Sequence, residues 1–317
     1  MNAKRIALVL ACLITALAAW VPAQALEPGD HAFTLMHGGL ERNYSLHLPP
    51  QARAGRPLPA VLNFHGGGGN AKAHRDYVRM DALADREGFL VVYPNGSGGL
   101  RDTLLTWNAG SCCGFAALGH VDDVGFAGAL LDDIARRTPL DTARVYATGL
   151  SNGAMMAYRL AAQLPERIAA VAPVAGAMVT REIYPGRAVP VMHIHSSDDP
   201  RALYDGGLGP PFPMTRTRVL HPPVEEGVAR WVRSDACAAK PRQDAPLRDD
   251  KGHTAARSVW GKCRDGAEVV LWKLSGAGHV WPGGKPDYLP LLLGASTGVI
   301  DANQEMWRFF SRFSLPH

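Results

Sequence analysis

The chain has 317 residues, with 33 basic and 29 acidic side chains and an apolar fraction typical of globular proteins. It contains no internal repeat, no low-complexity tract and no basic run interleaved with aromatic residues. We therefore expect neither a nucleic-acid partner nor a disordered chain. This length is sufficient for one large domain with a full hydrophobic core.

The first 25 residues have the pattern of a secretory signal peptide. Lys4 and Arg5 are followed by an apolar run over 6–20 and by Ala23-Gln24-Ala25, an A-x-A cleavage sequence. The apolar run is shorter than the roughly 20 residues that cross a bilayer. We expect cleavage near Ala25, a secreted or periplasmic protein without a membrane span, and a single domain over 26–317.

Beyond this segment, apolar runs typical of strands alternate with stretches typical of helices. The strand-like runs are 32–36, 44–48, 59–64, 90–93, 143–148, 169–174, 189–195 and 268–274, the first two forming a hairpin. The helical stretches are 77–87, 124–137, 154–162, 224–233 and 303–313. This alternation indicates an α/β fold with a mainly parallel, doubly wound sheet and helices on both faces. Two long irregular segments, 96–121 and 204–223, should rise above the carboxyl ends of the strands, where ligands bind in such sheets.

The sequence Gly149-Leu150-Ser151-Asn152-Gly153 lies between the predicted strand 143–148 and the predicted helix 154–162. Strand, G-x-S-x-G and helix are the context of a nucleophile elbow, a sharp turn that exposes a serine next to a base. Strand and helix approach closely at this turn, so the residues two before and two after the serine must be very small. Both are glycine. The pentapeptide alone is common by chance, but in this context it predicts Ser151 as a nucleophile.

In sheets with such an elbow, the partners of the serine follow it in the order acid, then histidine. Asp198 and Asp199 come directly after the strand-like run 189–195, so both are candidates. His279 lies in a loop of small residues, 276–284, after the next strand-like run. Such a loop lets the imidazole reach the serine, take its proton and return it to the leaving alcohol. The aspartate would fix the tautomer of the imidazole.

A histidine and four glycines, His65-Gly66-Gly67-Gly68-Gly69, follow the strand-like run 59–64. This is more glycine than a plain turn needs. We predict an oxyanion loop in which backbone N–H groups at Gly66 and Gly67, together with the N–H of Asn152, stabilise a tetrahedral intermediate.

Four cysteines lie beyond the predicted signal peptide, and in an exported protein they can pair. A Cys237–Cys263 bridge would close a loop of about 27 residues, worth roughly 3.5 kcal/mol in the chain-entropy model, and we predict it. Cys112 and Cys113 are adjacent, and neighbouring Cα atoms lie about 3.8 Å apart, below the usual disulfide span of about 4.4–6.8 Å. We expect these two to be paired with each other or unpaired.

Two further pairs of polar residues have structural explanations. His193 and His195 lie two apart on one face of a predicted strand. Without a third ligand at a suitable spacing, packing is favoured over a zinc site, and no metal is expected. Asp122 and Asp123 are explained by capping of the predicted helix 124–137.

Three aromatic residues, Trp107, Tyr204 and Trp281, have flat faces that can line a substrate pocket. Core packing is an equally good explanation for each of them. The sequence contains no phosphate loop and no dinucleotide fingerprint, so no cofactor is expected.

Together these motifs resemble those of the exported esterases grouped with polyhydroxybutyrate depolymerases and feruloyl esterases. The resemblance covers nearly all of the mature chain, and the histidine motif over 278–284 is its most specific part. It implies the α/β-hydrolase fold and a serine esterase that works through a Ser-His-Asp triad and an acyl-enzyme. Family members usually read His-Gly-x-x-Asp-x-x-Val-Pro-Tyr-x-Gly-Gly around the acid. In this chain the spacing from His195 assigns the acid to Asp199, but the glycine and the Val-Pro are absent, so Asp198 remains a rival.

The alternatives are an acyltransferase with the same triad and a non-catalytic binding protein on the same fold. Hydrolysis is favoured because the sequence shows no dedicated acceptor site and all triad members are present. The resemblance implies feruloyl, acetyl or short hydroxyalkanoate esters. No polymer-binding domain follows the last predicted helix, so small or oligomeric esters are expected rather than crystalline polymer. The sequence gives no indication of the oligomeric state.

Overall fold

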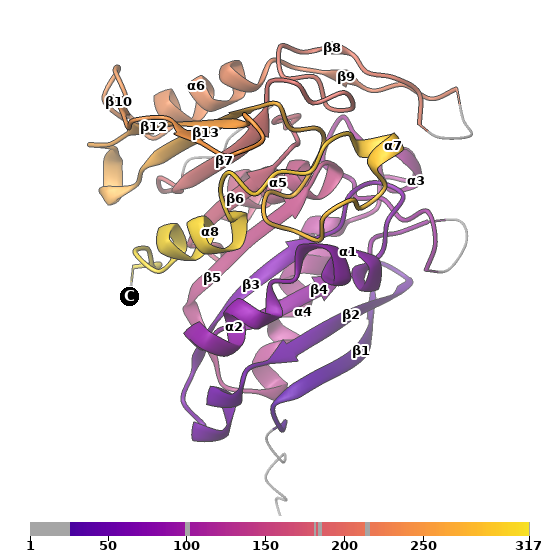
Figure 1. Cartoon of the computed structure of the whole chain (residues 1–317). Helices are drawn as coiled ribbons and strands as arrows, with labels where there is room; N and C mark the ends of the chain where they lie inside the picture. Colours follow the sequence, from indigo (N-terminus) through magenta and orange to yellow (C-terminus); the bar gives the residue numbers. More distant parts are fainter. Residues whose placement is uncertain (1–25, 99–101, 181, 183–185, 213–215, 317) are drawn as a thin grey trace, which may run out of the picture.

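The computed structural model describes residues 26–98, 102–180, 182, 186–212 and 216–316. The predicted signal peptide therefore lies outside the described residues. Within them, an 11-stranded sheet has the order β1-β2-β4-β3-β5-β6-β7-β13-β12-β10, with β11 paired to β12 (Figure 1). The strands are β1 Gly29–His37, β2 Leu40–Leu48, β3 Leu58–Phe64, β4 Leu90–Pro94, β5 Leu140–Leu150, β6 Ala170–Val174, β7 Val191–Ser196, β10 Arg242–Gln243, β11 Leu247–Arg248, β12 Thr254–Trp260 and β13 Val269–Ser275.

The central strands β4, β3, β5, β6, β7 and β13 are parallel, and the strands at both edges are antiparallel. Successive side chains of a strand point to opposite faces, as β3 illustrates. Leu62 and Phe64 contribute to one hydrophobic core, whereas Val61 contributes to the other. The mainly parallel α/β sheet expected from the sequence is therefore confirmed.

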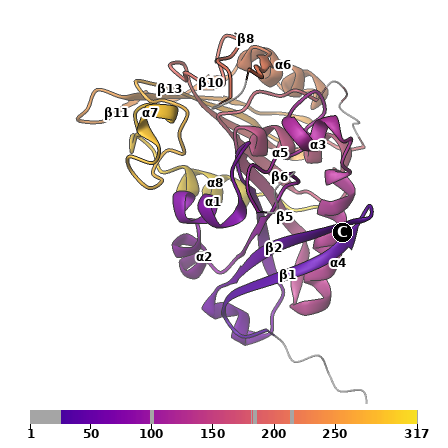
Figure 2. The same cartoon turned by 90° about the vertical axis from the view of Figure 1, so that its right-hand side faces the viewer.

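Helices cover both faces of this sheet (Figure 2). On one face α4 (Asp123–Arg137), α5 (Asn152–Gln163) and α6 (Val224–Ser234) pack into the first core. On the other face α1 (Ala71–Val78), α2 (Asp81–Glu87) and α8 (Ala302–Phe310) pack into the second. No helix of the described residues is long and apolar enough to cross a bilayer.

Most predicted elements agree with the structure apart from shifts of a few residues at their ends, but one predicted helix was wrong and strand β12 was not predicted. The helix expected over 77–87 is broken into α1 and α2 at Arg79, whose φ of 56° is left-handed. Asn70 caps α1 by accepting a hydrogen bond from the N–H of Ala73, so this helix also begins earlier than expected. Strand β12 was missed because only Ala255 and Val259 are buried in it, which leaves a weak apolar alternation.

The described residues of the two long segments contain little regular structure: α3 (Gly114–Leu118) in the first, and the two-residue strands β8 (Gly207–Leu208) and β9 (Leu220–His221) in the second. Both reach the carboxyl ends of the central strands, as expected. The backbone of Trp107 is hydrogen-bonded to Asn152, just after β5. The ring of Phe212 lies 3.3 Å from the Cβ position of Gly67, just after β3.

The structure pairs Cys237 with Cys263 and Cys112 with Cys113. Cys237 follows α6 and Cys263 follows β12, so their bridge connects a helix of one face to the antiparallel edge of the sheet. Both cysteines pack with Ala188 and Ala267.

Replacing Cys237 and Cys263 together by serine should lower the free energy of unfolding by roughly 3.5 kcal/mol, because the unfolded chain regains the freedom of a loop of about 27 residues. Urea unfolding followed by circular dichroism measures this loss. Peptide mapping without reductant should return the Cys237–Cys263 pair, with Cys112 and Cys113 joined to each other or unpaired, and a Cys112–Cys237 cross-link would contradict this pairing.

Candidate active site

Ser151 lies at the sharp turn between β5 and α5. Its φ of 58° and ψ of −117° are unusual for a residue with a side chain, and such strain is common at functional sites. A Cβ atom at Gly149 would lie 2.6 Å from the carbonyl oxygen of Phe64, and one at Gly153 would lie 2.2 Å from the same atom. Only glycine therefore fits at both positions, as the elbow requires. The Ser151 hydroxyl does not cap α5, which leaves it available for chemistry.

Asp199 and His279, 80 residues apart in sequence, are joined by a hydrogen bond of 2.7 Å between His279 Nδ1 and Asp199 Oδ2. Both are buried, with exposed fractions of 5% for His279 and 4% for Asp199. Because Nδ1 donates to the carboxylate, Nε2 of the neutral imidazole carries the free lone pair. The backbone N–H groups of Gly278 and His279 donate to Ala295 and Leu293, which holds the histidine loop in place.

The carboxylate of Asp199 accepts hydrogen bonds on both oxygens. Oδ1 accepts from the N–H groups of Arg201 and Ala202, at 2.7 and 2.8 Å. Oδ2 accepts from His279 and lies 3.2 Å from His195 Nε2. Burial alone would raise the pKa of Asp199, but the charge of His279 and the hydrogen bonds from both histidines hold this pKa below its usual range.

Asp198 points elsewhere. It is exposed, and its Oδ2 accepts from the N–H of Gly276 at 2.8 Å, which ties the turn after β7 to the start of the histidine loop. Of the two carboxylates that the sequence left open, the structure thus brings Asp199 to His279.

His195 and His193 extend this network into the core. His195 Nε2 donates to the carbonyl of Ala202 at 2.8 Å, and its Nδ1 lies 3.0 Å from His193 Nε2. His193 Nδ1 in turn lies 2.9 Å from the hydroxyl of Tyr158, on α5. Both rings are 1% exposed. The two histidines are therefore packed residues, as expected, and they also connect α5 to the turn of Asp199, which the sequence did not indicate.

The glycine loop after β3 runs beside the elbow. The Cβ position of Gly66 lies 3.5 Å from Cβ of Ser151, and that of Gly67 lies 3.5 Å from Cβ of Asn152. The N–H groups of Gly68 and Gly69 donate to Leu105 and Gly66. Those of Gly66 and Gly67 have no acceptor within the described part of the chain. Asn152 is the first residue of α5, where backbone N–H groups lack partners inside the helix. All three N–H groups are thus available next to Ser151.

The three aromatic residues considered for a substrate pocket are buried in the protein. The exposed fraction is 0% for Trp107, 3% for Tyr204 and 1% for Trp281. The indole of Trp281 donates to Asn303, and the hydroxyl of Tyr204 donates to Glu225. Burial of this degree favours the packing explanation over direct contact with substrate.

His221, on β9, was missed because it lies in a segment rich in Gly and Pro that carries no motif. It is 7% exposed. Burial and then the neighbouring charge of His279 lower the pKa of His221 to about 4. The segment over 204–223 therefore places a neutral imidazole close to the Asp199–His279 pair.

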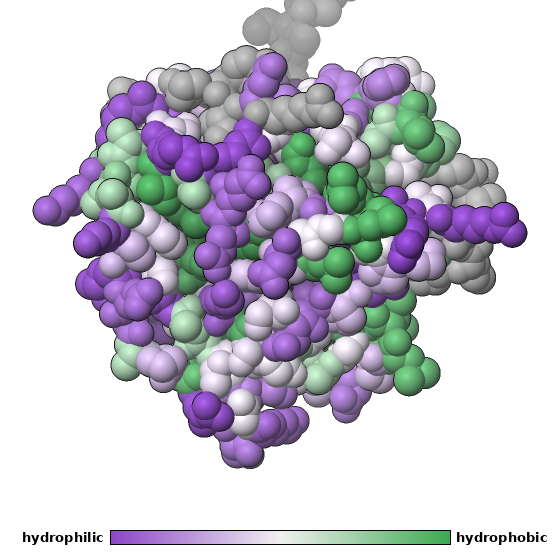
Figure 3. All heavy atoms as spheres, turned by 90° about the horizontal axis from the view of Figure 1, so that it is seen from above, coloured by the Kyte–Doolittle hydropathy of each residue, from purple (hydrophilic) through white to green (hydrophobic). Residues whose placement is uncertain are grey.

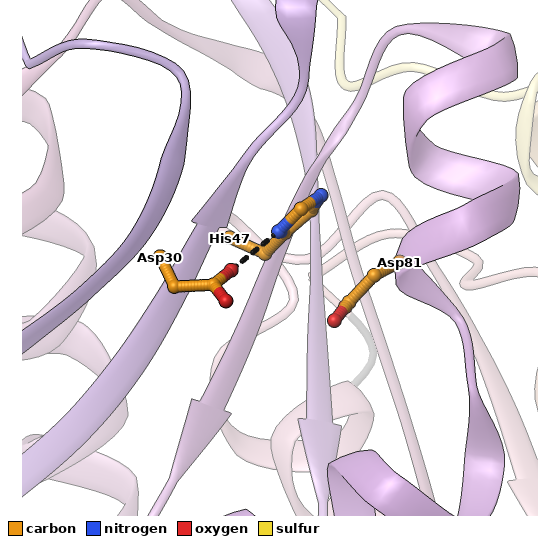
Figure 4. Close-up of side chains that lie close together, drawn as sticks. All are labelled: Asp30, His47 and Asp81. Atoms are coloured by element: carbon orange, nitrogen blue, oxygen red, sulfur yellow. Dashed lines mark hydrogen bonds and ion pairs between the residues drawn. The ribbon is translucent and has the colours of Figure 1, made fainter.

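A separate cluster of Asp30, His47 and Asp81 lies away from the elbow, between β1, β2 and α2 (Figure 4). These three residues could hold a metal ion by their spacing. However, the His47 ring nitrogens face Asp30 at 2.7 Å and Asp85 at 2.9 Å, and the Arg75 guanidinium bridges Asp30 and Asp81. Burial lowers the pKa of His47, and its carboxylate partners outweigh this and raise it. The cluster is a network of ion pairs.

The buried imidazole of His65 should make the stability of the protein depend on pH. Burial lowers its pKa from 6.5 to about 4, so the folded protein keeps the ring neutral while the unfolded chain takes up a proton below about pH 6.5. Stability should therefore fall as the pH decreases from about 6.5 to 4, by up to roughly 2 kcal/mol for this residue between pH 6.5 and 5. In urea unfolding at several pH values, His65→Asn should flatten this decrease. The exposed His120 provides the control, and an equal effect of His120→Asn would contradict the assignment.

The parallel sheet, the elbow and the aspartate–histidine pair define the chain as an α/β-hydrolase. The solved structure of an acetyl xylan esterase from Aspergillus awamori superimposes with a TM-score of 0.60 at 16% identity, covering 89% of this chain and 99% of that one. This likeness concerns the fold.

The chain belongs to the family of PHB depolymerase esterases, whose model matches residues 42–234. It is 33% identical over 275 residues to a protein of Nocardia uniformis subsp. tsuyamanensis with the provisional name esterase NocK, covering 81% of this chain and 76% of that one. It is 25% identical over 281 residues to feruloyl esterase B of Piromyces equi, covering 87% of this chain and 46% of that one. The protein is a carboxylic ester hydrolase.

Proposed function

We propose that Ser151, His279 and Asp199 form a catalytic triad that hydrolyses esters through an acyl-enzyme. The observation that carries this proposal is the 2.7 Å hydrogen bond between His279 and Asp199, beside an elbow that exposes Ser151. Among the described residues no hydrogen bond joins Ser151 to His279. In enzymes without substrate this bond is often long and tightens when substrate binds.

In the proposed reaction Ser151 Oγ attacks the ester carbonyl while His279 Nε2 takes its proton. The tetrahedral oxyanion accepts hydrogen bonds from the N–H groups of Asn152 and of Gly66 or Gly67. The C–O bond to the alcohol then breaks, and His279 returns the proton to that alcohol. Water repeats the sequence on the acyl-enzyme and releases the acid. Asp199 stays ionised and stabilises the imidazolium in both halves.

We propose feruloyl, acetyl or short hydroxyalkanoate esters as substrates. The name of the Piromyces equi relative supports feruloyl esters, and the name of the family supports hydroxyalkanoate esters. Apolar side chains on elements that flank His279 support an ester with an apolar part: Leu208 and Leu220 are 53% and 71% exposed on β8 and β9, and Leu291 is fully exposed on α7 (Pro290–Leu293). On the face of the molecule seen from above, hydrophobic residues gather in several patches among hydrophilic ones (Figure 3).

We also propose that the protein is exported and that residues 26–317 form a single catalytic domain. The basic start, the apolar run and the A-x-A sequence over 1–25 support this. Amino-terminal sequencing of the protein recovered from the periplasm or the medium should begin at Leu26. A mature protein that begins at Met1 would contradict export by this route.

The deciding experiment is a substrate panel of methyl ferulate, acetylated xylan, p-nitrophenyl acetate and hydroxybutyrate oligomers. Each is assayed with the native protein and with Ser151→Ala. We expect at least one class to be hydrolysed with a kcat/KM about tenfold above the others, and no turnover by the variant. Equal, low turnover by both proteins on every ester would overturn the proposal.

A further inference from the structure

We propose that Trp107 is a positioning residue that fixes the direction of the oxyanion-hole donors on both sides of Ser151. Its indole holds the glycine loop, and its backbone holds the side chain of Asn152. This inference rests on the proposed function, because it concerns the same oxyanion hole. It also gives the long segment over 96–121 a role other than contact with substrate.

On the first side, the indole N–H of Trp107 donates to the carbonyl oxygen of His65 at 3.0 Å. That carbonyl belongs to the same peptide unit as the N–H of Gly66. A trans peptide is planar, and its C=O and N–H point in opposite directions. Holding the carbonyl on the side of Trp107 therefore turns the Gly66 N–H to the opposite side.

The next peptide unit, between Gly66 and Gly67, is also held by hydrogen bonds to its carbonyl. The carbonyl of Gly66 accepts from His65 Nδ1 at 2.8 Å and from the N–H of Gly69 at 3.0 Å. His65 Nε2 accepts from the N–H of Gly96 at 3.0 Å, so Nδ1 carries the proton that it donates. The direction of the Gly67 N–H follows from these bonds. Trp107 also packs on the His65 ring, with centroids 4.9 Å apart.

On the second side, the Asn152 side chain pairs with the backbone of Trp107. Asn152 Oδ1 accepts from the Trp107 N–H at 2.7 Å, and Nδ2 donates to the Trp107 carbonyl at 3.0 Å. With the amide turned the other way, Nδ2 would face the Trp107 N–H and Oδ1 would face the Trp107 carbonyl. Donor would then meet donor, and acceptor would meet acceptor. Asn152 is 2% exposed, so no water competes for this pairing. This side-chain pairing therefore holds Asn152, the residue whose backbone N–H donates to the oxyanion in the proposed reaction.

Trp107 is itself held rigidly. Its ring meets Phe64 edge-on at 5.0 Å, and its carbonyl also accepts from the N–H of Cys113 at 3.0 Å. The next residue, Asn108, donates its N–H to Asp123 at 2.7 Å. Asp123 is fully buried and forms an ion pair with Arg42 at 2.7 Å. A buried charge pair thus anchors the segment from which Trp107 reaches both halves of the site.

Because the oxyanion develops only in the transition state, loosening its donors should lower kcat and leave KM nearly unchanged. Removing one donor outright lowers kcat by about 10²–10³. Trp107→Phe keeps an aromatic side chain but removes the indole N–H. The peptide unit between His65 and Gly66 then loses the hydrogen bond that orients it, while the Gly66 N–H itself remains. We expect a decrease in kcat of about 10- to 100-fold.

The matched control is Trp272→Phe. Trp272 is 5% exposed, and its indole N–H has no hydrogen-bond partner within the described part of the chain. This substitution changes a buried tryptophan in the same way without loosening an oxyanion donor, so kcat should stay within about twofold. Equal losses in the two variants would overturn the positioning role, because they would show a general effect of core substitution.

A trifluoromethyl ketone provides the specific readout, because its adduct with a serine carries an oxyanion. For Trp107→Phe its inhibition constant should rise by the same factor as kcat/KM falls. A fluorophosphonate should still label one serine per molecule, which shows that the fold and the nucleophile remain. Unchanged inhibition together with reduced kcat would overturn the inference.

Asn152→Asp tests the second side even if Trp107→Phe does not fold. An ionised Asp accepts from the Trp107 N–H but repels the Trp107 carbonyl, so kcat should again fall about 10- to 100-fold with little change in KM. Normal kcat in Asn152→Asp would overturn the inference. Failure of the proposed function would look different: Ser151→Ala would then keep its activity, whatever Trp107 does.

Discussion

Replacement of Ser151 by alanine is expected to lower kcat by roughly 10⁶, the scale for loss of a triad serine. Without the hydroxyl no acyl-enzyme forms, and only the oxyanion donors and substrate binding remain to assist water. KM should change little, because the hydroxyl contributes to bond formation rather than to ground-state binding. Steady-state kinetics on the best ester of the panel measures this loss.

The matched control is Ser258→Ala, since Ser258 in β12 is also partly exposed but lies on the antiparallel edge of the sheet. Its activity should equal that of the native protein. A fluorophosphonate should label Ser151, and it should label no other serine of the chain. Label elsewhere, or near-normal turnover in Ser151→Ala, would show that this elbow does not supply the nucleophile.

The second large effect is expected for Asp199→Asn, which should lower kcat by about 10⁴. Asparagine keeps the shape of the side chain but places an N–H₂ group where His279 or His195 donates. The imidazole of His279 then turns to the tautomer whose proton sits on Nε2, and it no longer accepts the proton of Ser151. Folding should be preserved, because the bonds from Arg201 and Ala202 to Oδ1 need only an oxygen.

Asp198→Asn is the neighbouring control. Asp198 accepts a hydrogen bond from the N–H of Gly276, which an asparagine oxygen also accepts, so kcat should remain within about threefold, less than the net contribution of one hydrogen bond. If Asp198→Asn were the inactive variant and Asp199→Asn the active one, the acid would lie one residue earlier than proposed.

The sequence was sufficient to predict the parallel sheet and the elbow, because both depend on local patterns. Glycine at positions 149 and 153 is required by the close contact with Phe64, and this requirement is visible in the pentapeptide itself. The choice between Asp198 and Asp199 was different. The spacing from His195 favoured Asp199, but the altered turn left Asp198 as a rival, and the packed position of His279 against Asp199 supports the first assignment.

Roles that depend on distant partners were not predictable from the sequence. The pattern around Trp107 indicates an aromatic side chain in a long loop, but its partner Asn152 lies 45 residues away. His193 and His195 were recognised as one face of a strand, whereas Tyr158, which completes their network, belongs to α5. The helix break at Arg79 was missed because a left-handed residue other than glycine carries no clear sequence signal.

The hydrogen bonds in the row from Tyr158 through His193 and His195 to the turn of Asp199 all run in the same direction. The carbonyl of Ala202 can only accept, so His195 Nε2 carries a proton, and with both rings neutral His193 donates to His195 and Tyr158 donates to His193. Burial raises the pKa of the Tyr158 hydroxyl, so it keeps its proton. Every hydrogen in the row therefore points from α5 towards the turn of Asp199, and the carboxylate oxygen that accepts from His279 also faces a hydrogen-bond donor, His195 Nε2, rather than a lone pair.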